Sequence, residues 1–212
     1  MATADLLLSV AGKELGVKED PMYSNKVKYN NWYYGRTVSG QDYPWCMVFV
    51  QWVFSQAGVQ LPLLTASCGA LMNAAKRAEQ WVSGDYRRGD VVIYSFVPED
   101  IPQHCGIVES VSGSSVTCIE GNTSIAGSQS NGGQVLRRTR NKGYVLGAVR
   151  PEFREEKTMD NKASPAHEEG VAWAVEKGIL RGNGQGDLML RQPLTREQFC
   201  TMLYRYDQSR KK

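Results

Sequence analysis

The chain has 212 residues, of which 42% are hydrophobic and 22% charged, which is enough to bury the core of one ordinary domain and leave room for a small appendage. A net charge of +3 is too small for a typical nucleic-acid binder, and no apolar run approaches the ~20 residues of a membrane span. The opening residues also lack the basic and apolar segments of a signal peptide, so we expect synthesis in the cytoplasm.

The first part of the chain predicts helices around a long irregular segment. Residues 4–15 and 44–57 have apolar side chains at helical spacing, and the second stretch begins with Pro44 and is followed by Gly58. Residues 17–43 are rich in Tyr and Trp but lack periodicity, which favours a loop that either contacts a glycan or packs over the core.

The middle of the chain predicts one more helix and then a run of strands. The helix is capped by Thr65 or Ser67 and extends to about residue 80. The strands are expected at 91–94, 104–111, 116–120, 134–140 and 144–149. Helices followed by antiparallel strands predict an α+β domain in which the helices pack on one side of a curled sheet.

We expect this domain to occupy residues 1–151, followed by a charged linker at 152–164 and a helical module at 165–212. In the module, Thr195 and Gln198 form a capping box that begins the last helix. Fewer than about fifty residues form a marginal core, so we expect the module to pack on the first domain or on another copy, as a homo-oligomer.

Cys46 is the candidate nucleophile. It falls in the first turn of the helix at 44–57, where the helix dipole and a nearby imidazolium both lower the pKa of a thiol. Its own backbone N–H would stabilise an oxyanion there. The alternative is that Cys46 is a small core residue, the usual role of cysteine.

His104 is the candidate base, with Glu120 and Asn122 to orient it. If residues 112–115 form a hairpin turn, the numbers of two residues that face one another across the strands have a constant sum. Any even sum places these three side chains on one face of the sheet, and a sum of 226 sets His104 opposite Asn122. Glu120 or Asn122 then accepts the imidazole N–H and fixes its tautomer. An odd register removes this arrangement and leaves an ordinary surface histidine.

The other cysteines carry no metal-binding pattern. They lie at 68, 105, 118 and 200, without a C-x-x-C pair, so we expect free thiols and neither metal nor cofactor. We expect Cys105 and Cys118 to point away from the face of His104 and Glu120, and His167 to lie in solvent.

Four segments in this order resemble the CHAP family, the cysteine- and histidine-dependent amidohydrolases/peptidases of bacterial and phage cell-wall lysis. They are Tyr43-Pro44-Trp45-Cys46, Arg88-Gly89-Asp90-Val91-Val92, His104-Cys105-Gly106-Ile107-Val108 and Glu120-Gly121-Asn122. The resemblance covers about residues 1–150 and implies a papain-like fold that hydrolyses amide bonds of peptidoglycan. It puts the nucleophile on Cys46, the base on His104 and the orienting groups on Glu120 and Asn122.

The resemblance also bears on residues near Cys46. It suggests Gln41 as an oxyanion group, whereas the aspartates that hold calcium in some relatives are represented only by Asp42, so we expect no metal there. Among the aromatic side chains nearby, Trp32, Tyr43 and Trp45 are candidate substrate contacts.

The tail is similar to a single surface-layer homology motif, on Ala172-Trp173-Ala174, Gly178-Ile179-Leu180 and the segment 193–198. This implies attachment to wall polymers, while a plain helical hairpin that serves stability or oligomerisation is the alternative.

Together these features suggest a phage-type endolysin, or a bacterial autolysin, that cuts peptidoglycan as an N-acetylmuramoyl-L-alanine amidase or an endopeptidase. Without a signal peptide it would reach the wall by lysis or through a helper pore. The alternatives are a non-catalytic wall-binding protein and a papain-like transferase or deamidase acting on proteins.

Overall fold

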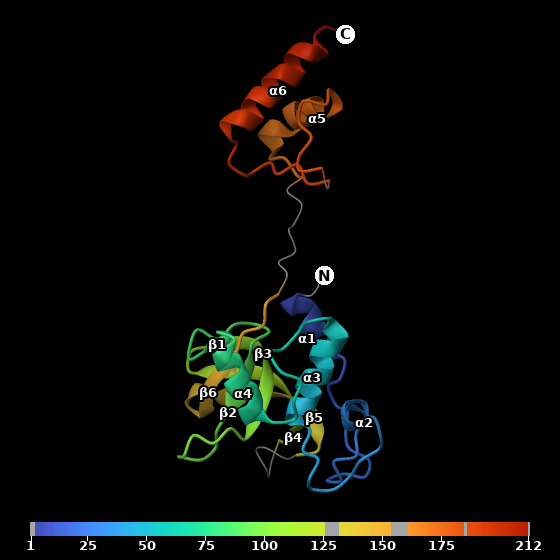
Figure 1. Cartoon of the computed structure of the whole chain (residues 1–212), viewed down its shortest axis with the longest axis vertical. Helices are drawn as coiled ribbons and strands as arrows, with labels where there is room; N and C mark the ends of the chain where they lie inside the picture. The colour runs from blue at the N-terminus through green and yellow to red at the C-terminus, as the bar shows by residue number, and fades with distance from the viewer. Residues whose placement is uncertain (1–2, 126–131, 154–160, 185, 212) are drawn as a thin grey trace. The chain divides into compact units, whose positions relative to one another are not determined.

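The computed structural model describes residues 3–125, 132–153, 161–184 and 186–211 (Figure 1). The chain divides into two compact units, Met1–Glu155 and Glu156–Lys212. Much of the linker expected at 152–164 lies outside the described residues. No helix in the described ranges is both long and apolar enough to cross a bilayer.

The described part of the N-terminal unit contains four α-helices. They are α1 (Ala4–Gly12), α2 (Lys28–Tyr34), α3 (Cys46–Ala57) and α4 (Cys68–Arg77). Ser67 caps α4 by accepting a hydrogen bond from the backbone of Ala70, and α3 ends at Gly58 in the left-handed conformation. The helices predicted near 4–15, 44–57 and 67–80 are therefore confirmed, each somewhat shorter than expected.

Helix α2 corrects the prediction that residues 17–43 are irregular. Its seven residues are too few for a helical period to stand out in the sequence, and no side chain caps its start. Packing stabilises it instead, because Tyr29 is fully buried against Trp45 and Phe49, with ring centroids 5.4 and 5.1 Å away. The Tyr29 hydroxyl donates to Glu14 over 2.6 Å.

The strands form one six-stranded antiparallel sheet in the order β1-β6-β2-β3-β4-β5. Their bounds are β1 (Trp81–Val82), β2 (Val91–Tyr94), β3 (His104–Ser112), β4 (Ser115–Thr123), β5 (Gln134–Asn141) and β6 (Val145–Val149). The predicted strands are confirmed, and the two-residue β1, which the sequence did not predict, adds an edge to β6.

The main core lies between the helices and one face of the sheet, as Figure 1 shows for α1 and α3. There α3 packs on β3 and β4. A smaller apolar cluster covers the opposite face, made of Val92, Tyr94, Val108, Val116, Cys118 and Ala148. The expected α+β architecture is confirmed.

A β-bulge at Glu109 sets the register that matters for the site. Next to the turn, Ser112 pairs with Ser115, an odd sum of 227, whereas Ile107 pairs with Ile119, an even sum of 226. The register changes between Val108 and Ser110. The extra residue of the bulge therefore makes the sum of paired residue numbers even in the part of β3 that precedes Glu109. The register considered from the sequence, with a sum of 226, holds at Ile107 and Val108, on the His104 side of the bulge.

The C-terminal unit contains a 3-10 turn (Pro165–His167), α5 (Glu168–Glu176) and α6 (Arg196–Ser209). The predicted capping box is confirmed, with Thr195 and Gln198 exchanging hydrogen bonds of 3.2 and 2.9 Å. Trp173 and Tyr206 contact edge to face at 6.1 Å, but both are more than a third exposed, so this unit has little core.

Candidate active site

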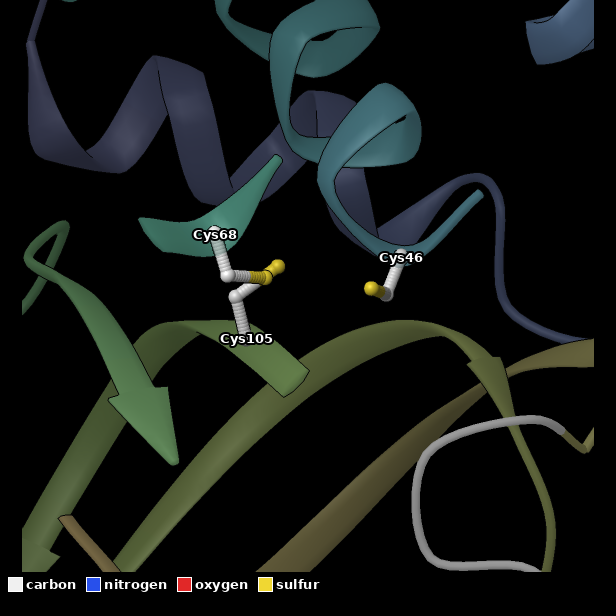
Figure 2. Close-up of side chains that lie close together, drawn as sticks. All are labelled: Cys46, Cys68 and Cys105. Carbon is white, nitrogen blue, oxygen red and sulfur yellow. The ribbon is translucent and has the colours of Figure 1, made fainter. Parts of the chain in front are cut away.

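Cys46 is the first residue of α3, at the end of the helix that faces the sheet (Figure 2). A residue at this position has a backbone N–H without an intrahelical acceptor and lies at the positive end of the helix dipole. Cys46 is only 6% exposed. The helix therefore supplies a nearly buried thiol with both a stabilising dipole and a donor for an oxyanion.

His104 and Glu120 form a fully buried pair on neighbouring strands. The imidazole Nε2 lies 3.0 Å from the Glu120 carboxylate, so this nitrogen is the protonated one. The other nitrogen, Nδ1, is buried and makes no regular hydrogen bond among the described residues. This leaves Nδ1 as the nitrogen that exchanges a proton with Cys46, whose thiol lies close enough for each group to shift the pKa of the other.

Arg140 completes the arrangement behind the histidine, and the sequence analysis missed it. Its Nε and Nη2 each donate to Glu120 over 2.7 Å, and its guanidinium lies over the Tyr94 ring at 5.3 Å. Thr123 donates a further hydrogen bond to Glu120. One signal was available in the sequence, the parity of residue numbers along a strand. Arg138 and Arg140 are two residues apart on β5, which pairs with β4, so both lie on the face of the sheet that carries Glu120.

These contacts move the pKa values in the direction that thiol chemistry requires. Burial opposes charge on His104, but hydrogen bonds and charges from Cys46 and Glu120 outweigh it and raise the histidine pKa from 6.5 to about 9. Hydrogen bonds from Cys105 and Cys68, with the nearby imidazole, hold the pKa of Cys46 well below its usual range despite burial. Burial also opposes charge on Glu120, yet Arg140 and His104 lower its pKa.

Asn122 does not contact His104 in any described interaction. Its side-chain oxygen accepts a 3.1 Å hydrogen bond from the backbone of Gly133, and its backbone has a φ of 53°. Of the two candidates that the sequence left open, Glu120 is thus the acceptor of the imidazole proton. Asn122 instead fastens the end of β4 to the residues that precede β5.

The residues expected around the nucleophile lie in different environments. Trp45 is fully buried and its indole donates to Glu19 over 2.7 Å, so it belongs to the core and cannot touch substrate. Trp32 is 38% exposed on α2, and Tyr43 is half-buried beside Tyr34, so both stay candidate contacts. Gln41 is exposed in the turn before α3, and its oxyanion role stays a prediction.

All five cysteines are free thiols. Cys105 points to the helix side of the sheet, as expected, where its sulfur lies within 4.8 Å of those of Cys46 and Cys68 (Figure 2). The expectation for Cys118 was wrong, because residues two apart on a strand share a face and Cys118 therefore lies on the side of Glu120. There it accepts a 3.2 Å hydrogen bond from the Tyr94 hydroxyl.

Comparison with known proteins supports the family resemblance. The family described as "CHAP domain" matches residues 38–122, which include Cys46, His104 and Glu120. No curated protein matches the chain.

The solved structures similar to this chain are distant from it in sequence. The crystal structure of Ly7917 is 16% identical with a TM-score of 0.42, over 70% of this chain and 62% of that one. The wild-type endolysin LysIME-EF1 is 14% identical with a TM-score of 0.42, over 83% and 86%. An NLP/P60-family protein similar to lipoprotein from Staphylococcus aureus is 14% identical with a TM-score of 0.36, over 71% and 42%.

The chain thus spans less than two thirds of the length of Ly7917. The motifs, the α+β fold and the family match agree on one assignment. Residues 38–122 of this chain match the CHAP domain family, and the α+β fold of the N-terminal unit agrees with that match.

Proposed function

We propose that the N-terminal unit is a thiol-dependent hydrolase that cuts amide or peptide bonds of bacterial peptidoglycan. The observation that carries the proposal is the thiol of Cys46 at a helix start, beside an imidazole that a buried carboxylate holds in one tautomer. The CHAP family supports peptidoglycan as the substrate.

The proposed reaction has two stages. The Cys46 thiolate attacks the carbonyl carbon, while the backbone N–H of Cys46 stabilises the oxyanion and Gln41 is the candidate second donor. The His104 imidazolium then protonates the leaving amine and an acyl-enzyme forms. In the second stage His104 takes a proton from water, and the resulting hydroxide releases the acyl group as a carboxylic acid and regenerates the Cys46 thiolate beside the imidazolium.

Glu120 and Arg140 act as positioning residues. The carboxylate keeps the proton on Nε2, so that Nδ1 always faces the sulfur, and Arg140 keeps the carboxylate charged and oriented. Trp32 and Tyr43 are the proposed substrate contacts on the exposed side.

The C-terminal unit is proposed to attach the enzyme to wall polymers, as its surface-layer homology-like motif implies. A groove of about 510 Å³ in this unit, lined by residues that include Ile179, Leu194 and Arg205, offers a surface for such a polymer. Self-association through this unit, and release to the wall by lysis or a helper pore, stay predictions.

Clearing of a suspension of purified cell walls tests the hydrolase. We expect the full chain to reduce turbidity and Cys46→Ala to abolish this, whereas Cys200→Ala, which removes the exposed thiol of the other unit, should clear walls like the wild type. If Cys46→Ala clears equally well, the thiol assignment is wrong. Wild-type protein that sediments with walls without clearing them would indicate a wall-binding protein instead.

The bond that is cut separates the two finer activities. Mass spectrometry of fragments released from defined peptidoglycan would show free lactyl groups for an amidase and new peptide N-termini for an endopeptidase. Activity on proteins but not on peptidoglycan would favour the transferase or deamidase alternative.

A further inference from the structure

Three buried thiols converge from three separate elements at the nucleophile. Cys46 is the first residue of α3, Cys68 is the first residue of α4, and Cys105 is the second residue of β3. Their sulfur atoms all lie within 4.8 Å of one another (Figure 2). The hydrolytic mechanism uses only the first of them, so Cys68 and Cys105 have no assigned role.

The geometry of this cluster is close to that of a metal site. In a tetrahedral zinc site the Zn–S bonds are about 2.3 Å, which places the sulfurs about 3.8 Å apart. Drawing three sulfurs together from at most 4.8 Å moves each by at most roughly 0.6 Å. Side-chain rotation is enough for such a shift, and no backbone rearrangement is needed.

Burial raises the pKa of Cys105 well above its usual range, so a bound cation would have to displace its proton, and two helix ends assist this. Both α3 and α4 direct their N-terminal, positive ends at the cluster, and this compensates part of the negative charge that metal-bound thiolates carry. Cys46 and Cys68 are each 6% exposed, while Cys105 is fully buried. Sulfur ligands without an oxygen select soft or borderline cations over Ca²⁺ and Mg²⁺.

We propose that Cys46, Cys68 and Cys105 form a binding site for a thiophilic divalent cation such as Zn²⁺, and that its occupancy blocks the nucleophile. Cys68 and Cys105 each release one proton as their sulfur–metal bonds form, Cys46 binds as the thiolate that it already is, and no electron is transferred. The fourth position of the ion is open to water or to the imidazole of His104. The inhibitory part rests on the proposed hydrolase function, but the binding part does not.

Binding is measured directly with Cd²⁺ as a spectroscopic probe, because its bonds to thiolates produce ultraviolet charge-transfer absorption. The full chain, kept reduced, is titrated with Cd²⁺ alone, and Zn²⁺ is then added as a competitor. We expect one ion per chain with the absorption of three thiolates, displaced by Zn²⁺. Absence of this absorption in the reduced, folded protein overturns the proposal.

Single substitutions identify the ligands. Loss of an outer-shell partner of a metal site costs about 10- to 100-fold in affinity, and loss of a ligand should cost more. Cys68→Ser and Cys105→Ser should therefore each weaken Cd²⁺ binding by more than about 100-fold. The matched controls are Cys118→Ser, a buried thiol on the other sheet face, and Cys200→Ser, and both should bind like the wild type. Unchanged affinity in folded Cys68→Ser or Cys105→Ser contradicts the site.

A measurement on unaltered protein covers the case in which a variant fails to fold. Alkylation followed by peptide mapping should show that Zn²⁺ protects Cys46, while the exposed Cys200 stays reactive. Alkylation of Cys46 at the same rate with and without Zn²⁺ overturns the site. Wall clearing in the same samples should fall as Zn²⁺ occupancy rises, and protein that binds Cd²⁺ but never clears walls refutes only the proposed function.

Discussion

Replacing Glu120 by Gln tests whether the buried carboxylate sets the protonation of His104. The amide keeps an oxygen that can accept the Nε2 proton but removes the negative charge 3.0 Å from the ring. The rise of the His104 pKa from 6.5 to about 9 corresponds to about 3 kcal/mol, since each tenfold change in protonation is worth about 1.4 kcal/mol.

Glu120 is one of the two groups that raise the His104 pKa, and an opposite charge at this distance shifts a pKa by roughly 1 to 3, so losing the carboxylate should lower the His104 pKa by roughly 1 to 2. Above its pKa, His104 no longer holds the proton that the leaving amine needs. The alkaline limb of the rate profile should therefore lie near pH 9 in the wild type and move to about pH 7 to 8 in the variant. The matched control is Glu109→Gln, whose carboxylate pairs with Arg137 instead.

The imidazole signals in nuclear magnetic resonance give the same pKa without an activity assay. The chain has only two histidines, and exposed His167 serves as an internal reference. Because the variant leaves Arg140 without its carboxylate, at a cost of about 3 to 5 kcal/mol, its folding is first checked by circular dichroism. A wild-type midpoint near 6.5, or a folded Glu120→Gln protein with an unchanged midpoint, would refute the reasoning.

Three further predictions concern stability. The charged form of His104 should stabilise the fold fully below about pH 6.5, and this contribution should disappear as the pH rises through 9, which urea unfolding across that window would show. Gly121→Ala places a Cβ 2.5 Å from the Cβ of Phe49 and should lower the free energy of unfolding by about 1 to 3 kcal/mol. The control is Gly12→Ala, whose new Cβ has no atom within 4 Å and should not lower it. Equal unfolding midpoints for the two variants would contradict this packing. Trp45→Phe removes the hydrogen bond to Glu19 and should lower the free energy of unfolding by about 1 to 3 kcal/mol. The KM for cell walls should not change, and a raised KM would mean that Trp45 contacts the substrate.

The sequence predicted most of the fold because its signals are local. Helix periodicity, caps such as Ser67 and Thr195, and apolar strand runs each depend on residues a few positions apart. Helix α2 escaped prediction because packing of Tyr29 between distant aromatic rings stabilises it. The same holds for β1, whose two residues form a strand only because β6 lies beside them.

The candidate site was predictable to the extent that strand parity and helix position determine it. Cys46, His104 and Glu120 follow from such arguments, but the choice between Glu120 and Asn122 depends on three-dimensional contacts. Arg140 and the clustering of Cys68 and Cys105 with Cys46 arise from pairings far apart in the chain. Apart from strand parity for Arg140, no spacing pattern in the sequence predicts them.

The bulge at Glu109 makes the site unequally sensitive to changes in chain length. Removing one residue between His104 and Glu109 would rotate the histidine to the wrong side of β3, whereas lengthening the tip of the hairpin at Gly113 would leave the paired strands as they are. Variants that gain or lose single codons should therefore stay lytic when the change falls at the tip and become inactive, though still folded, when it falls in the first half of the strand.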